Sequence, residues 1–321
     1  MPKIYVTCRV FDEALSRLRS AGHAVEARDE AGPIDRETLL SHIGDAEALV
    51  CLLSDRIDAD VFAAGPRLRI VANLGVGYDN IDLDAARAAS VIVTNTPRAL
   101  TETTADLTFA LLLAAARRIP EADGFVRSGE FLGWELIQPH IGLDVHGQTL
   151  GILGMGRIGT AVARRGRLGF GMTVLYHNRN RNPEAEAELG VTWVPFETLL
   201  AESDFLCTHP PLTAQTRHLF DREAFRRMKR SAILVNVARG PVVDEEALVW
   251  ALREGEIAGA GIDVYEKEPK VHPGLLALRE RVVLAPHIGS ATETTRRALA
   301  KLAVDNILAV LAGRPPINPV G

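Results

Sequence analysis

The sequence has 321 residues, of which 47% are hydrophobic and 24% are charged, and its formal net charge is −5. This length accommodates two domains with separate cores, the composition excludes a disordered chain, and the acidic balance argues against nucleic acid as a partner. The three cysteines, Cys8, Cys51 and Cys207, are too widely spaced for a disulfide framework or a Cys-x-x-Cys metal site, so we expect no metal and a reduced, cytoplasmic location.

The first part of the chain alternates short β-branched runs with helical stretches. Its expected strands are KIYVT, HAVEA, ALVCLL, LRIVANL and VIVTNT. The helices between them begin near Asp12, Asp35, Asp58 and Asp82, and aspartate is a favourable N-cap, so we expect each aspartate to cap its helix. The alternation predicts a parallel sheet covered by helices on both faces.

The strongest predicted helix covers residues 102–118. Its alanines and leucines make it too apolar for an exposed surface, so we expect it to be buried at a domain junction or in a homodimer interface. A helix buried within one chain would give the same pattern. The longest apolar run, FALLLAAA at 109–116, is too short to cross a membrane, so no membrane partner is expected.

A second series of strands and helices follows. Its expected strands are TLGILG, MTVLYHN, VTWV, FLCTHP, ILVNVA, GAGIDV and VVLAP, and a long helix then ends at Gly313. The sequence therefore predicts two doubly wound α/β domains. Because long helices bracket the second series, we expect the first domain to be built from both ends of the chain.

A glycine motif directly follows the first strand of the second series. Gly154, Gly156 and Gly159 form G-x-G-x-x-G at the start of a predicted helix. In this context the first two glycines allow a tight turn and close approach of backbone amides to a pyrophosphate, while the third packs the helix against the strand. The motif predicts a dinucleotide-binding site.

The next strand ends in HNRNR, without an acidic residue. His177 stands 23 residues after the first motif glycine (177 − 154 = 23), where proteins that bind NAD carry an acid for the ribose hydroxyl. Arg179 and Arg181 follow, and an arginine suits the 2′-phosphate of NADPH. Alternatively, both arginines are surface charges that pair with Glu184 and Glu186. Arg179 is the better candidate because it lies closer to the strand end.

A second group of polar residues follows three later strands. Arg239, Asp263 and His287 come at predicted strand ends and Glu268 lies in a loop after one of them. An arginine can hold a carboxylate, a histidine can transfer a proton near neutral pH, and a carboxylate can orient that histidine and favour its charged form. Together these groups suit the reduction of a 2-keto acid.

Several motifs together resemble those of the D-isomer-specific 2-hydroxyacid dehydrogenase family, and more closely its glyoxylate/hydroxypyruvate reductase branch. They include LGVGYDNID, NTP, GMGRIG, HPPLTAQTRHLF, NVARGPVVDEEAL, AGAGIDVYEKEP and HIGSAT. The resemblance implies a flavodoxin-like substrate-binding domain formed by residues 1–98 and 289–321. It also implies a Rossmann dinucleotide-binding domain at residues 99–288, with the active site in the cleft between the two.

The resemblance also implies a role for each site residue. Arg239 clamps the substrate carboxylate and polarises the carbonyl, His287 is the acid–base, and Glu268 pairs with it. The other expected substrate-binding residues are Val76 and Gly77 through their amides, Ser290, and Trp134, which lies in a stretch that in related reductases reaches the partner subunit. The expected cofactor-binding residues are Thr104, Gly154, Met155, Gly156, Arg157, Ile158, Asn178, Arg179, Arg181, Pro210, Ala238, Asp263 and His287.

The expected function is NAD(P)H-dependent reduction of glyoxylate or hydroxypyruvate to glycolate or D-glycerate, with NADPH preferred over NADH, by a homodimer. A D-lactate or phosphite dehydrogenase would keep a similar Arg239, Glu268 and His287 set. Formate dehydrogenases, which carry glutamine in place of Glu268, are disfavoured. A nucleotide-sensing corepressor of the same fold, or a phosphoglycerate dehydrogenase with a regulatory domain, would carry further segments that this sequence does not contain.

Overall fold

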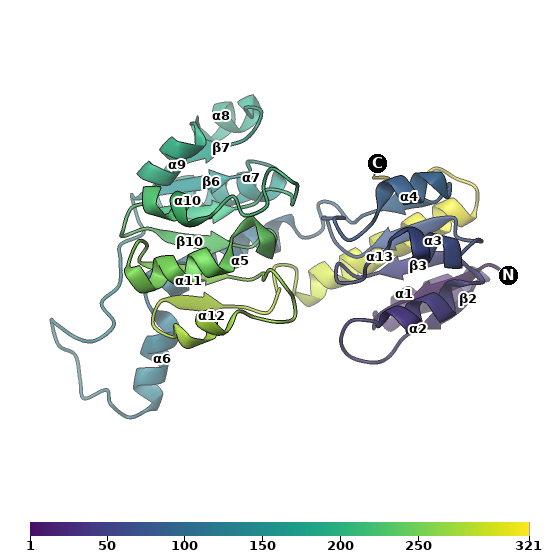
Figure 1. The fold of residues 1–321 in the computed structure, drawn as a ribbon, viewed down its shortest axis with the longest axis horizontal. Coiled ribbons are helices and arrows are strands. Elements are labelled where there is room, and N and C mark those ends of the chain that lie inside the picture. Colours follow the sequence, from purple (N-terminus) through teal and green to yellow (C-terminus); the bar gives the residue numbers. More distant parts are fainter. Residues whose placement is uncertain (321) are drawn as a thin grey trace. The chain divides into compact units, whose positions relative to one another are not determined.

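The computed structural model describes residues 1–320, which form two compact units (Figure 1). The first unit contains Met1–Leu100 together with the chain from Ala291 onward, and the second contains Thr101–Ser290. Each unit has its own sheet, in which all named strands are parallel. The prediction of two parallel-sheet α/β domains is confirmed.

The first unit contains a five-stranded sheet in the order β2-β1-β3-β4-β5, the flavodoxin-like arrangement. The strand order reverses at β1, which has β2 on one side and β3 on the other. The strands are β1 (Lys3–Val6), β2 (Ala24–Ala27), β3 (Ala46–Cys51), β4 (Ile70–Asn73) and β5 (Ile92–Thr94).

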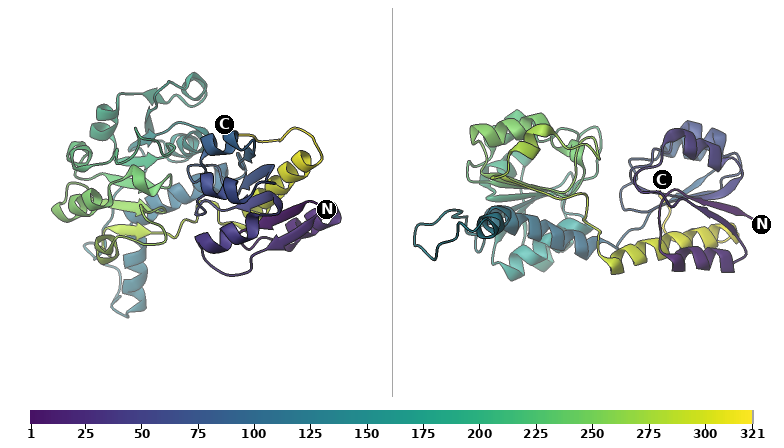
Figure 2. Two further views of the ribbon diagram at one scale, coloured as in Figure 1. Left: turned by 45° about the vertical axis from the view of Figure 1, so that its right-hand side comes forward. Right: turned by 90° about the horizontal axis from the view of Figure 1, so that it is seen from below.

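Helices cover both faces of this sheet (Figure 2). Successive strand residues alternate between the two faces, so that Ile4 packs in one apolar core and Tyr5 in the other. One core contains residues of α1 (Asp12–Ser20) and α13 (Glu293–Leu311). The other contains residues of α2 (Arg36–Ile43), α3 (Ala59–Ala64) and α4 (Leu83–Ala88).

Only two of the four expected aspartate caps form. Asp35 accepts a hydrogen bond from the Thr38 amide, and Asp82 caps α4 through the first-turn amides. Asp58 stands at the N-cap of α3 but its carboxylate pairs with Arg36 and Arg56 instead, since an arginine offers it a stronger charge-assisted bond. Asp12 lies inside the first turn of α1, where it faces the positive end of the helix dipole.

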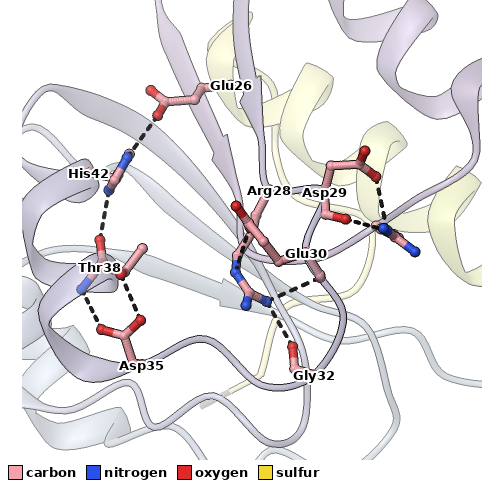
Figure 3. A network of polar contacts seen from close by, with 9 residues as sticks. Glu26, Arg28, Asp29, Glu30, Gly32, Asp35, Thr38 and His42 are labelled. Carbon is pink, nitrogen blue, oxygen red and sulfur yellow. Dashed lines mark hydrogen bonds and ion pairs between the residues drawn. The ribbon is translucent and has the colours of Figure 1, made fainter.

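The Asp35 cap belongs to a polar network around β2 and α2 (Figure 3). Arg28 donates to the carbonyl oxygen of Gly32 at 2.8 Å and pairs with Glu30 at 3.0 Å. His42, on α2, lies 3.2 Å from the Glu26 carboxylate and 2.8 Å from a backbone carbonyl of its own helix. These contacts hold the loop between β2 and α2 against the ends of both elements.

The second unit contains a seven-stranded sheet in the order β12-β11-β10-β9-β6-β7-β8. Its order reverses at β6, which pairs with β7 on one side and β9 on the other, and ligands of such sheets bind at the carboxyl ends of strands beside this point. The strands are β6 (Thr149–Leu153), β7 (Thr173–His177), β8 (Thr192–Trp193), β9 (Phe205–Thr208), β10 (Ile233–Asn236), β11 (Gly259–Ile262) and β12 (Val282–Leu284).

Helices also cover both faces of the second sheet (Figure 2). One apolar core holds residues of α5 (Thr101–Ala116), α7 (Arg157–Arg164) and α8 (Pro183–Leu189). The other holds residues of α9 (Phe196–Glu202), α10 (Arg222–Arg227), α11 (Glu245–Glu254) and α12 (Pro273–Ala277). A π-turn (Arg165–Gly169) extends α7, a short 3-10 turn (Gly240–Val242) follows β10, and α6 (Ile119–Arg127) has no buried residue.

The apolar helix α5 is buried within the second unit. Leu111, Leu112 and Ala116 are nearly inaccessible, and a Cβ at Gly261 of β11 would lie only 2.9 Å from the Cβ of Leu111. A glycine in the strand therefore lets the helix pack closely on the sheet. This packing explains the apolar composition of α5. The helix is therefore buried within its own unit, which is the alternative to burial at a domain junction or in a dimer interface.

Among residues 1–320, no helix is both long enough and apolar enough to cross a membrane.

Candidate active site

Three neighbouring strands bring the predicted polar residues to one edge of the large sheet. In the parallel register, Asn236 of β10 lies beside Ile262 of β11, and Ile262 lies beside Leu284 of β12. Arg239, Asp263 and His287 each follow one of these strands within three residues. The carboxyl ends of the strands therefore place all three at the same sheet edge.

His287 and Glu268 form the central contact of this edge. The Nδ1 atom of His287 lies 2.8 Å from Oε2 of Glu268, and each side chain is about one-third exposed. The second carboxylate oxygen of Glu268 accepts a hydrogen bond from the Tyr265 amide at 3.0 Å. Because Glu268 occupies Nδ1, the imidazole nitrogen that can pass a proton to a bound molecule is Nε2.

The surroundings of Glu268 favour its charged form. Burial by itself would raise the pKa of this carboxyl. The hydrogen bond and charge of His287, the Tyr265 amide and the positive charge of Arg239 outweigh burial and bring the pKa of Glu268 below its ordinary value. Glu268 is thus a carboxylate near neutral pH, paired with the histidine and within the field of the arginine.

Asp263 shapes the loop that carries His287. Its two carboxylate oxygens accept hydrogen bonds from the amides of Ile288, at 2.7 Å, and Gly289, at 2.9 Å, and its carbonyl accepts from the His287 amide. The side chain is almost fully buried, and burial raises its pKa despite the two amides and the charge of His287. Thr104 supports the same loop, since its hydroxyl donates to the Gly289 carbonyl at 3.1 Å.

Asn236 is a site residue that sequence reasoning missed. Its Nδ2 donates to the Arg239 carbonyl at 3.1 Å, and its Oδ1 accepts from the Ala238 amide at 3.1 Å and from the Thr208 hydroxyl at 2.7 Å. This buried amide therefore fixes the turn that presents Arg239. The sequence held one signal for it, a lone polar residue at the end of an otherwise apolar strand.

Gly240 is required in the same turn. A Cβ at this position would lie 1.9 Å from the carbonyl carbon of Tyr265, so any other residue would separate the two loops. The guanidinium of Arg239 bonds to the neighbouring Ala238 carbonyl at 2.8 Å, which holds the side chain close to its own turn.

The glycine-rich turn fits a dinucleotide. Gly154 has a φ of +97°, and a Cβ there would lie 2.7 Å from the backbone of His209 and Pro210, so only glycine allows the turn to pass this strand end. A Cβ at Gly159 would lie 2.2 Å from the Gly154 carbonyl oxygen, which confirms its packing role. At Gly156 a Cβ would meet no atom within 4 Å, so the N-terminus of α7, including Arg157 and Ile158, borders open space.

Two further observations support this fit. The Nε2 atom of His209 is buried and has no hydrogen-bond partner among residues 1–320, and burial lowers the pKa of this histidine to about 3, so the ring is neutral. Beside it, the amide of Met155 donates to Oδ1 of Asn178 at 2.7 Å. Asn178 thus ties the end of β7 to the glycine-rich turn.

The two arginines after β7 differ in their contacts. Arg181 forms a two-point ion pair with Glu186, at 2.5 and 3.0 Å. This pair agrees with the alternative in which Arg181 is a surface charge. Arg179 is exposed, and no ion pair of its side chain occurs among the residues that the structure describes. Of the two, Arg179 is the arginine whose charge is available to a ligand.

In the first unit, the loop that contains Val76 and Gly77 presents backbone amides. Among residues 1–320, the amides of Val76, Gly77 and Tyr78 donate to no protein atom, and all three residues are accessible to solvent. Backbone amides that have no protein acceptor can donate to a bound anion. This geometry suits the expected contact of Val76 and Gly77 with a carboxylate.

The structure does not bring Trp134 to Arg239, Glu268 and His287. Trp134 lies in the irregular segment between α6 and β6 and is 78% exposed (Figure 1). Ser290 lies three residues after His287 and is partly buried. The expected pocket role of Trp134 therefore does not follow from the fold of a single chain.

Comparison with known proteins finds relatives along nearly the whole chain. The sequence model of the family described as "D-isomer specific 2-hydroxyacid dehydrogenase, NAD binding domain" matches residues 109–289. The glyoxylate reductase of Thermococcus onnurineus is 51% identical over 98% of this chain and 94% of its own length, and that of Korarchaeum cryptofilum is 50% identical over 99% and 96%. The solved NADPH-dependent glyoxylate/hydroxypyruvate reductase of Sinorhizobium meliloti, in complex with NADP and malonate, is 36% identical with a TM-score of 0.87, covering 100% of this chain and 97% of that one. The similarity extends through both units.

Proposed function

Because this chain belongs to the D-isomer specific 2-hydroxyacid dehydrogenase family, in its glyoxylate reductase branch, we propose that it uses NADPH to reduce glyoxylate to glycolate and hydroxypyruvate to D-glycerate. The protein is an oxidoreductase that takes a nicotinamide cofactor. The choice of keto acid and of NADPH over NADH is our proposal. It draws on the polar groups of the large sheet and on what the related reductases are named for.

The residues of the carboxyl edge supply what the reduction of a keto acid needs besides the hydride. A reduced nicotinamide, when bound, supplies that hydride to the carbonyl carbon. Protonated His287 gives its Nε2 proton to the carbonyl oxygen, and Glu268 holds the ring through Nδ1 and stabilises its charge. The carbonyl becomes a hydroxyl, and His287 recovers its proton from solvent.

Arg239 binds and polarises the keto acid. Its guanidinium can make two parallel hydrogen bonds to a carboxylate, and its positive charge stabilises the negative charge that develops on the carbonyl oxygen. We assign to the amides of Val76 and Gly77 a further contact with the carboxylate. In this assignment the substrate must carry a carboxylate next to its carbonyl, which glyoxylate and hydroxypyruvate both do.

The observation that carries this proposal is the 2.8 Å contact between His287 and Glu268 in the field of Arg239. A helix cap or a surface ion pair would involve at most two of the three groups His287, Glu268 and Arg239. A histidine oriented by a carboxylate and accompanied by an arginine is suited to donate a proton to an anionic substrate.

For the cofactor, we assign the glycine-rich turn to the pyrophosphate and Arg179 to the 2′-phosphate of NADPH. No carboxylate stands at the end of β7 to accept a ribose hydroxyl, and Arg179 is exposed. A charge-assisted hydrogen bond contributes roughly 1.5–3 kcal/mol, enough to favour NADPH by about tenfold or more. Asp263 and Thr104 are assigned to the nicotinamide end, through the loop that they hold.

We also propose that the protein is a homodimer, with residues 119–143 of each copy in the contact. This segment exposes large apolar side chains, including Leu132 at 95%, Ile137 at 83% and Trp134 at 78%. Large exposed apolar side chains concentrated in one segment are typical of an interface. Sedimentation of the wild-type protein measures the oligomeric state, and Leu132→Glu with Ile137→Glu is expected to yield a monomer.

The function is tested by initial rates with glyoxylate, hydroxypyruvate and pyruvate, each with NADPH and with NADH, and by the oxidation of phosphite with NADP and NAD. We expect the highest kcat/KM with glyoxylate or hydroxypyruvate and NADPH. A higher kcat/KM with pyruvate or phosphite would assign the protein to another activity of the same family. A preference for NADH would contradict only the assignment of Arg179 to the 2′-phosphate and would leave the proposed reaction unchanged.

A further inference from the structure

We propose that Asn73 and Asn95 are positioning residues that aim the backbone amides of the loop Gly75–Tyr78 at the substrate carboxylate. The inference rests on the proposed function, in which Val76 and Gly77 bind that carboxylate, and it adds the amide of Tyr78 as a third donor. Neither asparagine is itself offered as a contact of the substrate.

Asn73 is the last residue of β4 and is completely buried. Its Nδ2 donates a hydrogen bond of 2.7 Å to the carbonyl oxygen of Gly77. Its Oδ1 accepts from the side-chain amide of Asn80 at 3.4 Å, so the orientation of the Asn73 amide is fixed from both ends. The strand end thereby holds the far side of the loop.

Asn95 follows β5 and is 8% exposed. Its Nδ2 donates to the carbonyl oxygen of Val76 at 2.7 Å. The next residue, Thr96, donates its backbone amide to the carbonyl oxygen of Gly75 at 2.9 Å. Two neighbouring strands therefore hold three consecutive carbonyl groups of one loop.

The direction of the amides follows from the planarity of the peptide bond. In a trans peptide, the carbonyl of one residue and the N–H of the next point in opposite directions. Because the carbonyls of Gly75, Val76 and Gly77 are held by the strand ends, the N–H groups of Val76, Gly77 and Tyr78 point away from those donors. Those three N–H groups have no protein acceptor among residues 1–320, so they are available to an anion.

The chemistry of asparagine is specific to this task. A carbonyl oxygen accepts only from a hydrogen-bond donor such as the Nδ2 of asparagine, and an ionised aspartate of the same shape would place a carboxylate oxygen against it. Replacing either asparagine should therefore release one peptide group of the loop and let its N–H turn away. The loss of one oriented amide to a charged carboxylate corresponds to roughly a tenfold change in binding.

The test compares Asn95→Asp, Asn95→Ala and Asn73→Ala with the wild type. We expect the KM for glyoxylate and the dissociation constant of oxalate, measured by calorimetry on the protein with NADP bound, to rise about tenfold. The KM for NADPH should stay within about twofold, because the glycine-rich turn lies in the other unit and is unchanged.

A control outside this loop separates positioning from general destabilisation. Asp35 also lies in the first unit, where its carboxylate accepts hydrogen bonds from the amide and the hydroxyl of Thr38 at the start of α2. Asp35→Ala should lower the melting temperature and leave the KM for glyoxylate unchanged. An equal rise in KM for Asp35→Ala would overturn the positioning role.

The two proposals fail in different ways. If the wild type binds oxalate but reduces no keto acid with either cofactor, the proposed function is wrong and the positioning of the amides stands. If the wild type reduces glyoxylate and both Asn95 variants bind oxalate as tightly as it does, the positioning role is wrong and the function stands. A wild type that binds no oxalate also overturns the positioning role.

Discussion

Two stretches of the same sheet edge differ in how their charges are held. After β10, β11 and β12, the charged groups meet one another: His287 contacts Glu268 at 2.8 Å, and His287 and, more weakly, Arg239 lower the pKa of that carboxyl. After β7, Arg181 pairs with Glu186, whereas Arg179 is exposed and forms no ion pair with any of residues 1–320. In the first stretch the protein side chains orient one another, whereas the exposed arginine of the second stretch acquires a defined role only when a ligand binds.

This difference teaches which parts of a site follow from protein contacts. Side chains that contact one another have defined orientations in the structure, because each is oriented by the next. An exposed arginine has no such partner to orient it, and its role depends on the free energy of one contact with a bound phosphate. Variants at the two stretches should therefore differ in the size of their effects.

The largest effect is expected for Arg239→Ala. Loss of two charge-assisted hydrogen bonds should lower kcat/KM for glyoxylate by ~10²–10⁴-fold, with the KM for the keto acid rising far more than the KM for NADPH. Arg239→Lys should recover only part of the activity, since an ammonium lacks the planar fork. Arg227→Ala, which removes an exposed partner of Glu223, is the control and should change neither constant. Equal changes in both KM values would make Arg239 a structural residue.

The next largest effect is expected for Glu268→Gln. The amide keeps the shape of the side chain but removes the negative charge that holds the His287 ring, so kcat/KM for glyoxylate should fall roughly 10- to 100-fold while the KM for NADPH changes little. Initial rates at neutral pH measure both constants. Glu266→Gln removes a second carboxylate from the loop of Glu268, one that lies 3.1 Å from His218, and should leave kcat/KM unchanged.

The same variant has a predicted effect on stability. A carboxyl whose pKa is lower in the folded than in the unfolded chain stabilises the fold above its unfolded pKa and loses that contribution as the pH falls through the folded value. The melting temperature of the wild type should therefore exceed that of Glu268→Gln at neutral pH, and the difference should shrink in acid. A difference that grows in acid would contradict the lowered pKa.

A smaller effect is expected for Asn236→Ala, which loosens the turn that presents Arg239. The lost contacts should lower kcat/KM for glyoxylate about tenfold and the free energy of unfolding by about 1–3 kcal/mol. Thr208→Val removes the hydroxyl that supports Asn236 but keeps both contacts between Asn236 and the turn, so its effect on kcat/KM should be smaller. The reverse order would place the main support of the turn at Thr208.

The smallest effect is expected for Arg179→Ala, at the exposed stretch. Because the contact is exposed, the ratio of kcat/KM with NADPH to kcat/KM with NADH should fall by about tenfold, which is the lower end of the range given above. Arg181→Ala is the matched control, two residues along the same loop, and should change this ratio less because its guanidinium is already paired with Glu186. A larger effect at Arg181 would assign the 2′-phosphate to Arg181 instead of Arg179. The ion pair between Arg181 and Glu186 would then have to rearrange when the cofactor binds.

Local patterns were sufficient for the fold class and for the main polar groups. The period of apolar residues and the glycine motif predicted two parallel-sheet units, which the structure confirms. Gly154, Gly156 and Gly159 have the backbone geometry that their spacing implies. The sequence was less informative about caps, because Asp58 is drawn to Arg36 and Arg56, which approach it only in the folded chain.

The sequence by itself determined which residues follow which strands, and the parallel topology then required Arg239, Asp263 and His287 to share one edge. Only the tertiary structure decided how each side chain is used: that Arg181 pairs with Glu186 while Arg179 stays exposed, that α5 packs inside its own unit, and that Asn73, Asn95 and Asn236 hold loop carbonyls. The physical reason is that spacing along the chain fixes the order of elements, whereas the partner of a polar group depends on which atoms the fold brings within hydrogen-bonding distance.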